Sequence, residues 1–109
     1  MAFDEQLAER IRASLGKRRG IVEKKMFGGI GFLLNGNMCV GVHQTDLIVR
    51  LAPDETDAAF KQPHTRPFDL TGRPMKGWIL VEPAGLKTPA RLSKWIEMAA
   101  SYAGSLPPK

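Results

Sequence analysis

The spacing of apolar residues changes repeatedly along the chain, and each change predicts a new element of structure. From position 3 to position 15 the apolar residues recur every four residues, which predicts a helix with Asp4 as its N-cap and Gly16 at its C-terminal end. After Gly20 the period shortens, and apolar runs predict strands at 21–27, 31–34, 38–42 and 47–51.

Turn residues join these strands. Asn35-Gly36 lies between two apolar runs and is the dipeptide most typical of a tight hairpin, because both of its residues tolerate positive φ. A second short turn at 44–46 precedes the last run. The first half of the chain therefore predicts a helix followed by an antiparallel meander of three or four strands.

The second half of the chain returns to helix and then to strand. Pro53 begins a short predicted helix. A short strand follows at 67–70, and its proline places it at a sheet edge, since proline cannot donate a ladder hydrogen bond. The run at 77–82 predicts a stronger strand.

The final helix has the clearest start. Thr88 is its predicted N-cap, Pro89 its first residue and Gly104 its end. The order helix, three or four strands, helix, two strands, helix predicts an α+β two-layer sandwich, in which the helices cover one face of an antiparallel sheet. We expect one domain over 1–104 and a disordered tail over 105–109.

Composition fits this interpretation. The 109 residues are 43% hydrophobic, which suits one soluble domain with its own core. Cys39 is the single cysteine, so neither an intramolecular disulfide nor a cysteine-rich zinc site is expected. The polar start is unlike a signal peptide, and no apolar run approaches the roughly 20 residues that span a bilayer. We therefore expect a cytoplasmic protein without a membrane partner.

Charge adds a candidate partner. Sixteen Lys and Arg residues against eleven Asp and Glu give a net charge of +5, which makes nucleic acid a candidate ligand. The cations concentrate at 10–25, where the candidate phosphate contacts are Arg12, Lys17, Arg18, Arg19, Lys24 and Lys25. No aromatic residue is interleaved with them, and no helix-turn-helix or RNP pattern is present. A solvated charged face is therefore favoured over a nucleic-acid site.

The reactive residues form no catalytic pattern. His43 and His64 have no nucleophile or carboxylate at a spacing typical of a triad, and Cys39 alternates with apolar residues in a predicted strand. We expect Cys39 in the core, and we keep a small enzyme that uses His43 or Cys39 as an alternative. The acidic string 54–57 is interpreted as the first turn of a helix, where the helix dipole favours anions. No cofactor or metal is predicted.

The most conspicuous local motif is a glycine-rich string comprising Met26, Phe27, Gly28, Gly29 and Gly31. Phosphate cradles place such glycines before a helix N-terminus, whereas this string runs into a hairpin. We therefore interpret the glycines as a bulge or a close approach of two backbones.

The two tryptophans receive different interpretations. Trp95 lies in the apolar stripe of the final helix and is predicted to belong to the core. Trp78 begins a predicted strand and is a candidate interface residue, because tryptophan is enriched at binding hot spots.

The glycine-rich string, with Lys25 before it, resembles the opening of the TfoX/Sxy N-terminal domain family. The resemblance continues through the hairpin at 35–40, the segment 72–75 and the Leu-x-x-Trp spacing of Leu92 and Trp95, and it covers about positions 20–103. It implies a two-layer fold related to secretion-chaperone-like domains. It also implies an association with competence regulation, in which the founding proteins act as transcriptional co-activators of DNA-uptake genes. Those regulators carry a second, C-terminal domain, and this sequence resembles the N-terminal domain alone.

The resemblance brings no catalytic residues with it. Together with the missing catalytic pattern, it favours a non-enzymatic protein-interaction and regulatory module. We expect a protein partner, and a homodimer that forms through the sheet or its edge. Direct nucleic-acid binding through the basic cluster at 10–25 is one alternative, and a small enzyme of unknown reaction is another.

Overall fold

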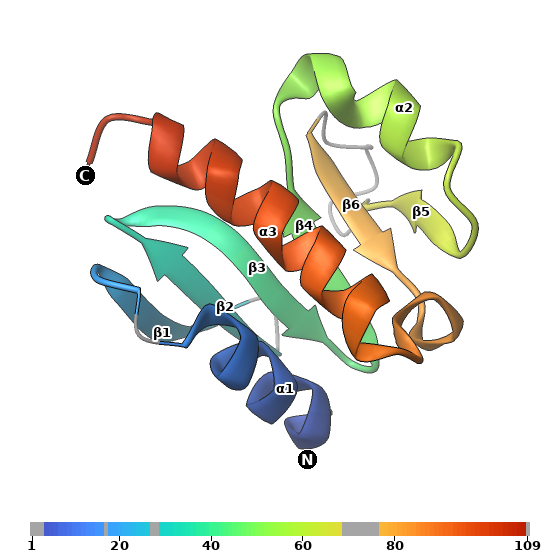
Figure 1. The fold of residues 1–109 in the computed structure, drawn as a ribbon, viewed down its shortest axis with the longest axis horizontal. Coiled ribbons are helices and arrows are strands. Elements are labelled where there is room, and N and C mark those ends of the chain that lie inside the picture. Colours follow the sequence, from blue (N-terminus) through green and yellow to red (C-terminus); the bar gives the residue numbers. More distant parts are fainter. Residues whose placement is uncertain (1–3, 17, 27–28, 69–76, 109) are drawn as a thin grey trace.

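Three helices cover one face of a six-stranded sheet (Figure 1). The computed structural model describes residues 4–16, 18–26, 29–68 and 77–108, with Met26 described by its backbone alone. In chain order the elements are α1 (Glu5–Leu15), β1 (Ile21–Met26), β2 (Gly29–Leu34), β3 (Asn37–His43), β4 (Asp46–Arg50), the 3-10 turn η1 (Pro53–Glu55), α2 (Thr56–Phe60), β5 (Thr65–Pro67), β6 (Trp78–Val81), the 3-10 turn η2 (Pro83–Leu86) and α3 (Pro89–Ser105). This order confirms the predicted α+β sandwich.

The sheet is antiparallel throughout, with the strand order β1-β2-β3-β4-β6-β5. Its first four strands are the predicted meander. Asn35 and Gly36 form the β2–β3 turn with φ values of 55° and 84°, as the hairpin dipeptide predicts. The edge strand occupies Thr65–Pro67 and so begins two residues before the predicted strand at 67–70. Phe68 follows the strand, and positions 69–70 lie outside the described residues. Its pairing begins at Thr65, opposite Val81.

A bulge and a close approach of two backbones shape the middle of the sheet. Phe32 pairs with Val40 and Leu33 with Met38, which leaves Cys39 as the extra residue on β3. A Cβ on Gly29 would lie 1.9 Å from the carbonyl oxygen of Val42. Gly29 therefore lies at a close approach of two backbones, and Phe27 and Gly28 lie outside the described residues.

The two faces of the sheet carry separate apolar clusters. The main core lies between the sheet and the helices, and it includes Trp95 and Ile96 of α3. Burial of Trp95 confirms its predicted place in the core. Side chains alternate along a strand, so Ile48 points to the opposite face. There it joins a smaller cluster with Phe68 and Leu80.

The helix ends follow local sequence signals. The carboxylate of Asp4 accepts a hydrogen bond from the Leu7 amide at 3.1 Å and caps α1, and Gly16 ends that helix with φ 59°. The prediction for α3 was wrong at its end, because the helix continues through Gly104 to Ser105. Leu106 then turns to extended backbone with ψ 152°. Leu106 precedes a proline, and that position disfavours helical backbone.

Candidate functional site

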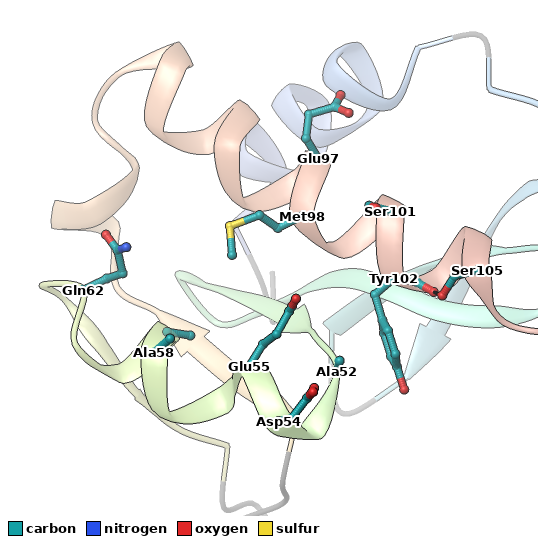
Figure 2. A pocket seen from close by; sticks show the side chains of 11 residues that line it. Ala52, Asp54, Glu55, Ala58, Gln62, Glu97, Met98, Ser101, Tyr102 and Ser105 are labelled. Carbon is teal, nitrogen blue, oxygen red and sulfur yellow. Dashed lines mark hydrogen bonds between the residues drawn. The ribbon is translucent and has the colours of Figure 1, made fainter.

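A groove of about 900 Å³ separates α2, with the turn before it, from α3 (Figure 2). Each wall contributes residues at positions i, i+1, i+4, i+5 and i+8. On α3 these positions share one helical face, and on the other wall they extend over η1, α2 and the turn after it. The lining residues are Asp54, Glu55, Ala58, Ala59 and Gln62 on one wall, Glu97, Met98, Ser101, Tyr102 and Ser105 on the other, and Ala52 at one end.

The interior of the groove combines apolar and acidic groups. The thioether of Met98 and the carboxylate of Glu55 point into the gap from opposite walls, and Asp54 lies beside Glu55 (Figure 2). Glu97 points away from the gap and accepts a hydrogen bond from Arg18. Within the described part of the chain, the carboxylates of Asp54 and Glu55 have no ion pair or hydrogen bond. The groove therefore presents two unneutralised carboxylates beside an apolar surface.

Buried Thr56 fixes the α2 wall. Its hydroxyl donates to the carbonyl oxygen of Pro53 at 2.9 Å and accepts from the amide of Gly77 at 2.8 Å. The carbonyl of Gly77 in turn accepts from the amide of Leu51 at 2.7 Å. These three bonds tie the start of α2 to the start of β6, so the wall is held by buried hydrogen bonds as well as by packing.

At the Tyr102 end of the α3 wall, the guanidinium of Arg50 lies near two aromatic rings, those of Tyr102 and Trp78. The guanidinium carbon of Arg50 lies 5.6 Å from the ring centroid of Tyr102 and 5.5 Å from that of Trp78. Both distances are within cation–π range. Trp78 also packs against Phe68, with ring centroids 5.8 Å apart. The candidate interface residue Trp78 is half-buried, and its ring lies near the same guanidinium as the ring of Tyr102, which lines the groove.

Two of the candidate phosphate contacts are engaged in ion pairs. Arg12 pairs with Glu9 and Glu23, and Arg18 pairs with Glu97. The other described members, Arg19, Lys24 and Lys25, are exposed. Lys24 and Lys25 are adjacent residues of a strand, so their side chains leave opposite faces of the sheet. Lys17 lies outside the described residues.

Cys39 is fully buried in the main core, as predicted. Burial raises the pKa of Cys39 to about 12, because an apolar surrounding disfavours the thiolate. A nucleophilic cysteine needs a thiolate and access to substrate, and Cys39 has neither.

The two histidines lie apart from the groove lining. His43 ends β3 opposite Asp46. His64 is exposed and lines a separate pocket of about 200 Å³ with Arg91 and Lys94. Among the described residues, no group of three or more His, Cys, Asp or Glu side chains is arranged to hold a metal ion. No described helix is long and apolar enough to cross a membrane.

The sequence patterns do not predict the groove. The acidic string 54–57 was interpreted only as a helix start, and it does occupy the first turns of η1 and α2. One signal was available, because 54–62 and 97–105 carry small, polar and apolar residues at the same helical spacing. That the two faces lie together depends on the packing of α2 and α3 into the same core, and the bond between Thr56 and Gly77 holds the α2 wall there. No local pattern encodes these long-range contacts.

Comparison with known proteins adds one relationship. No curated protein and no solved structure matches the chain. The family model described as the TfoX N-terminal domain matches residues 11–103, which is nearly the whole chain and agrees with the resemblance of the glycine-rich string. The chain therefore belongs to the TfoX N-terminal domain family.

Proposed function

We propose that this domain is a non-enzymatic protein-interaction module with a regulatory role, and that the groove between α2 and α3 is its docking surface. The observation that carries the proposal is the groove itself, in which Met98 and Tyr102 lie beside the unneutralised carboxylates of Asp54 and Glu55. Family membership supports a regulatory, competence-related domain. The TfoX N-terminal domain is not a known enzyme family.

The chemistry of the lining suits a macromolecular partner. Protein interfaces combine an apolar centre with a polar rim, and aromatic residues and methionine are enriched in them. Methionine adapts its shape to a partner, because its unbranched side chain has three rotatable bonds. The groove is bounded by two helical walls, which is the arrangement that receives a helix in several modes of peptide recognition.

The sheet edges are less suited to docking. The outer strand β1 carries Lys24 and Lys25, and the opposite edge strand β5 ends in Pro67. Lysine and proline at an edge disfavour pairing with another strand. A homodimer through the sheet or its edge stays a prediction, and light scattering at micromolar concentration tests it. A strict monomer would remove the dimer and leave the groove as the docking surface.

Capture of partners from the native host tests the docking surface. Ser101 is exposed in the groove, so Ser101→Arg places a large cation there without disturbing the core. Ala13→Arg adds the same side chain at an exposed position of α1 and serves as the matched control. We expect the wild type and Ala13→Arg to retain the same proteins and Ser101→Arg to lose them. Equal capture by all three proteins would contradict the assignment of the groove.

A further inference from the structure

We infer that the occupant of the groove is a cationic amphipathic helix of a partner protein. This inference rests on the proposed docking function and deepens it by naming the chemistry of the partner. The helix would place apolar side chains against Met98 and Tyr102, and Lys or Arg side chains against Asp54 and Glu55.

The dimensions of the groove fit a short helix. The α3 wall extends from Glu97 to Ser105, which at 1.5 Å per residue is about 12 Å, or roughly two helical turns. A partner helix therefore presents two or three apolar anchors at positions i, i+3 or i+4, and i+7. Met98 and Tyr102 occupy positions i and i+4 of α3, so they form one stripe that runs along the groove.

The charge of the groove selects the sign of the partner. The chain as a whole carries a net charge of +5, yet the groove exposes Asp54 and Glu55 without a cationic partner among the described residues. Glu97 is neutralised from outside by Arg18. A phosphate backbone would meet repulsion here, whereas Lys or Arg of a partner would form new ion pairs.

The charges also set a direction along the groove. Asp54 and Glu55 lie toward the end that holds Tyr102, and Gln62 lies at the other end (Figure 2). The Nζ atom of Lys94 donates to the side-chain oxygen of Gln62 at 3.4 Å, which brings a cation to that second end. The basic residues of the partner are therefore expected at one end of its helix, next to the acidic end of the groove.

A displayed peptide library tests the inference. Each member is an 18-residue helix with apolar residues at i, i+3, i+4 and i+7, and with its polar positions randomised among Lys, Arg, Glu, Asp, Gln and Ser. Selection against the wild-type protein is expected to enrich Lys and Arg toward one end of the helix. Enrichment of Glu or Asp, or no enrichment of charge, would overturn the inference.

Substitutions in the protein then locate the binding. The double variant Asp54→Asn/Glu55→Gln removes the two carboxylates of η1 that line the groove. Asp57→Asn removes an exposed carboxylate in the adjoining helix α2 that does not line the groove. By fluorescence anisotropy, the dissociation constant of a selected peptide should rise at least threefold for the double variant and less than twofold for Asp57→Asn. Equal effects would contradict direct pairing, and thermal denaturation checks that both variants are folded.

The outcomes separate this inference from the proposed function. If Ser101→Arg abolishes capture of host proteins while the selected peptides show no preference for cations, the groove docks a partner and the inferred chemistry is wrong. If Ser101→Arg leaves the capture of host proteins unchanged, the proposed docking function is wrong. A selected peptide that still binds at Asp54 and Glu55 would then show only that the groove prefers cations. Direct binding of a labelled duplex oligonucleotide to the protein that changes in the double variant Asp54→Asn/Glu55→Gln would place a polyanion in the groove and overturn the inference.

Discussion

The guanidinium of Arg12 donates two hydrogen bonds to the carboxylate of Glu23, from Nε to Oε2 and from Nη2 to Oε1, both at 2.7 Å. This paired geometry is specific to arginine and joins the last turn of α1 to the edge strand β1. The bond is also the largest cause of the lowered pKa of Glu23, because it favours the ionised carboxylate. The guanidinium of Arg12 is therefore engaged in a structural ion pair, which competes with any contact to phosphate.

The Arg12–Glu23 pair should contribute measurably to stability. A double-mutant cycle with Arg12→Gln and Glu23→Gln is expected to give a coupling of about 0.5–1 kcal/mol, since both partners are partly exposed and water screens them. Urea denaturation measures the free energy of unfolding of each variant. A coupling of zero would show that the paired geometry is not maintained in solution. Arg19→Gln, at an exposed cation of the same segment, should change stability little.

The same pair makes stability depend on pH. The pKa of Glu23 is lower in the folded state than its ordinary value of 4.5, so the ionised carboxylate stabilises the fold above that value. The contribution is lost as pH falls from about 4.5 through the lower, folded pKa. The stability difference between wild type and Glu23→Gln should therefore be present at pH 7 and shrink in acid. In the Arg12→Gln background this pH dependence should be much weaker.

Gly29 should not tolerate a side chain. Its Cβ would lie 1.9 Å from the Val42 carbonyl oxygen and 3.0 Å from the carbonyl carbon, and both atoms belong to a paired strand. Gly29→Ala is therefore expected to lower the free energy of unfolding by about 2–3 kcal/mol.

Gly104 provides the matched control for Gly29. A Cβ there would meet only Leu34 Cδ2, at an ordinary 3.6 Å, and the residue lies in the last turn of α3. Gly104→Ala should raise stability by up to about 0.5 kcal/mol, because alanine favours helix. Denaturation curves that show equal effects for the two variants would contradict the close approach at Gly29.

Thr56 should be needed for its hydroxyl and not only for its volume. Thr56→Val keeps the shape but removes the donor to Pro53 and the acceptor for the Gly77 amide. An unsatisfied buried amide costs about 1–3 kcal/mol, so Thr56→Val should be destabilised by that amount. Hydrogen exchange of the Gly77 amide should accelerate in Thr56→Val and change less in Thr56→Ser, which keeps the hydroxyl. Unchanged protection in Thr56→Val would show that the bond does not hold the α2 wall.

Cys39 should be unreactive while the protein is folded. With a pKa of about 12, only about one thiol in ten thousand is ionised at pH 8, and the side chain is fully buried. Labelling with a chromogenic disulfide is therefore expected to be at least 100-fold slower than for a free cysteine peptide, and to reach the peptide's rate in denaturant. Rapid labelling of the folded protein would support the alternative that the protein is an enzyme that uses Cys39.

The parts of the fold that sequence could predict are those set by neighbouring residues. The hairpin at Asn35-Gly36 and the caps at Asp4 and Thr88 depend on conformations that a few residues impose. Even the error at Gly104 is local, because Pro107 was the stronger stop signal and fixed Leu106 as extended. Such signals act within about one helical turn, so the few residues that determine each feature are neighbours in the sequence.

The functional surfaces depend instead on distant pairs. Arg12 and Glu23 are eleven residues apart, and Arg18 and Glu97 are seventy-nine apart. Either pair converts a candidate phosphate contact into a structural ion pair, and no count of local charge reveals it. The walls of the groove likewise come from segments 54–62 and 97–105, which are far apart in the chain, and the bond from Gly77 to Thr56 holds one of them. Sequence therefore located the cations, and tertiary structure decided which of them are available to a ligand.

Nucleic-acid binding by the basic cluster should consequently be weak and independent of sequence. Arg19, Lys24 and Lys25 are the described members without a carboxylate partner, and each phosphate contact changes the slope of log Kobs against log salt by about −0.9. Because Lys24 and Lys25 leave opposite faces of the sheet, at most two of the three cations contact one duplex. The slope should therefore be no steeper than about −1.8 for a labelled duplex between about 50 and 200 mM salt, measured by fluorescence anisotropy. Lys24→Glu/Lys25→Glu should remove most of this binding, whereas Lys61→Glu, at an exposed cation after α2, should lower it only slightly. A slope of about −3.6 would mean that Arg12 and Arg18 also exchange their carboxylates for phosphates, and it would favour direct nucleic-acid binding over protein docking.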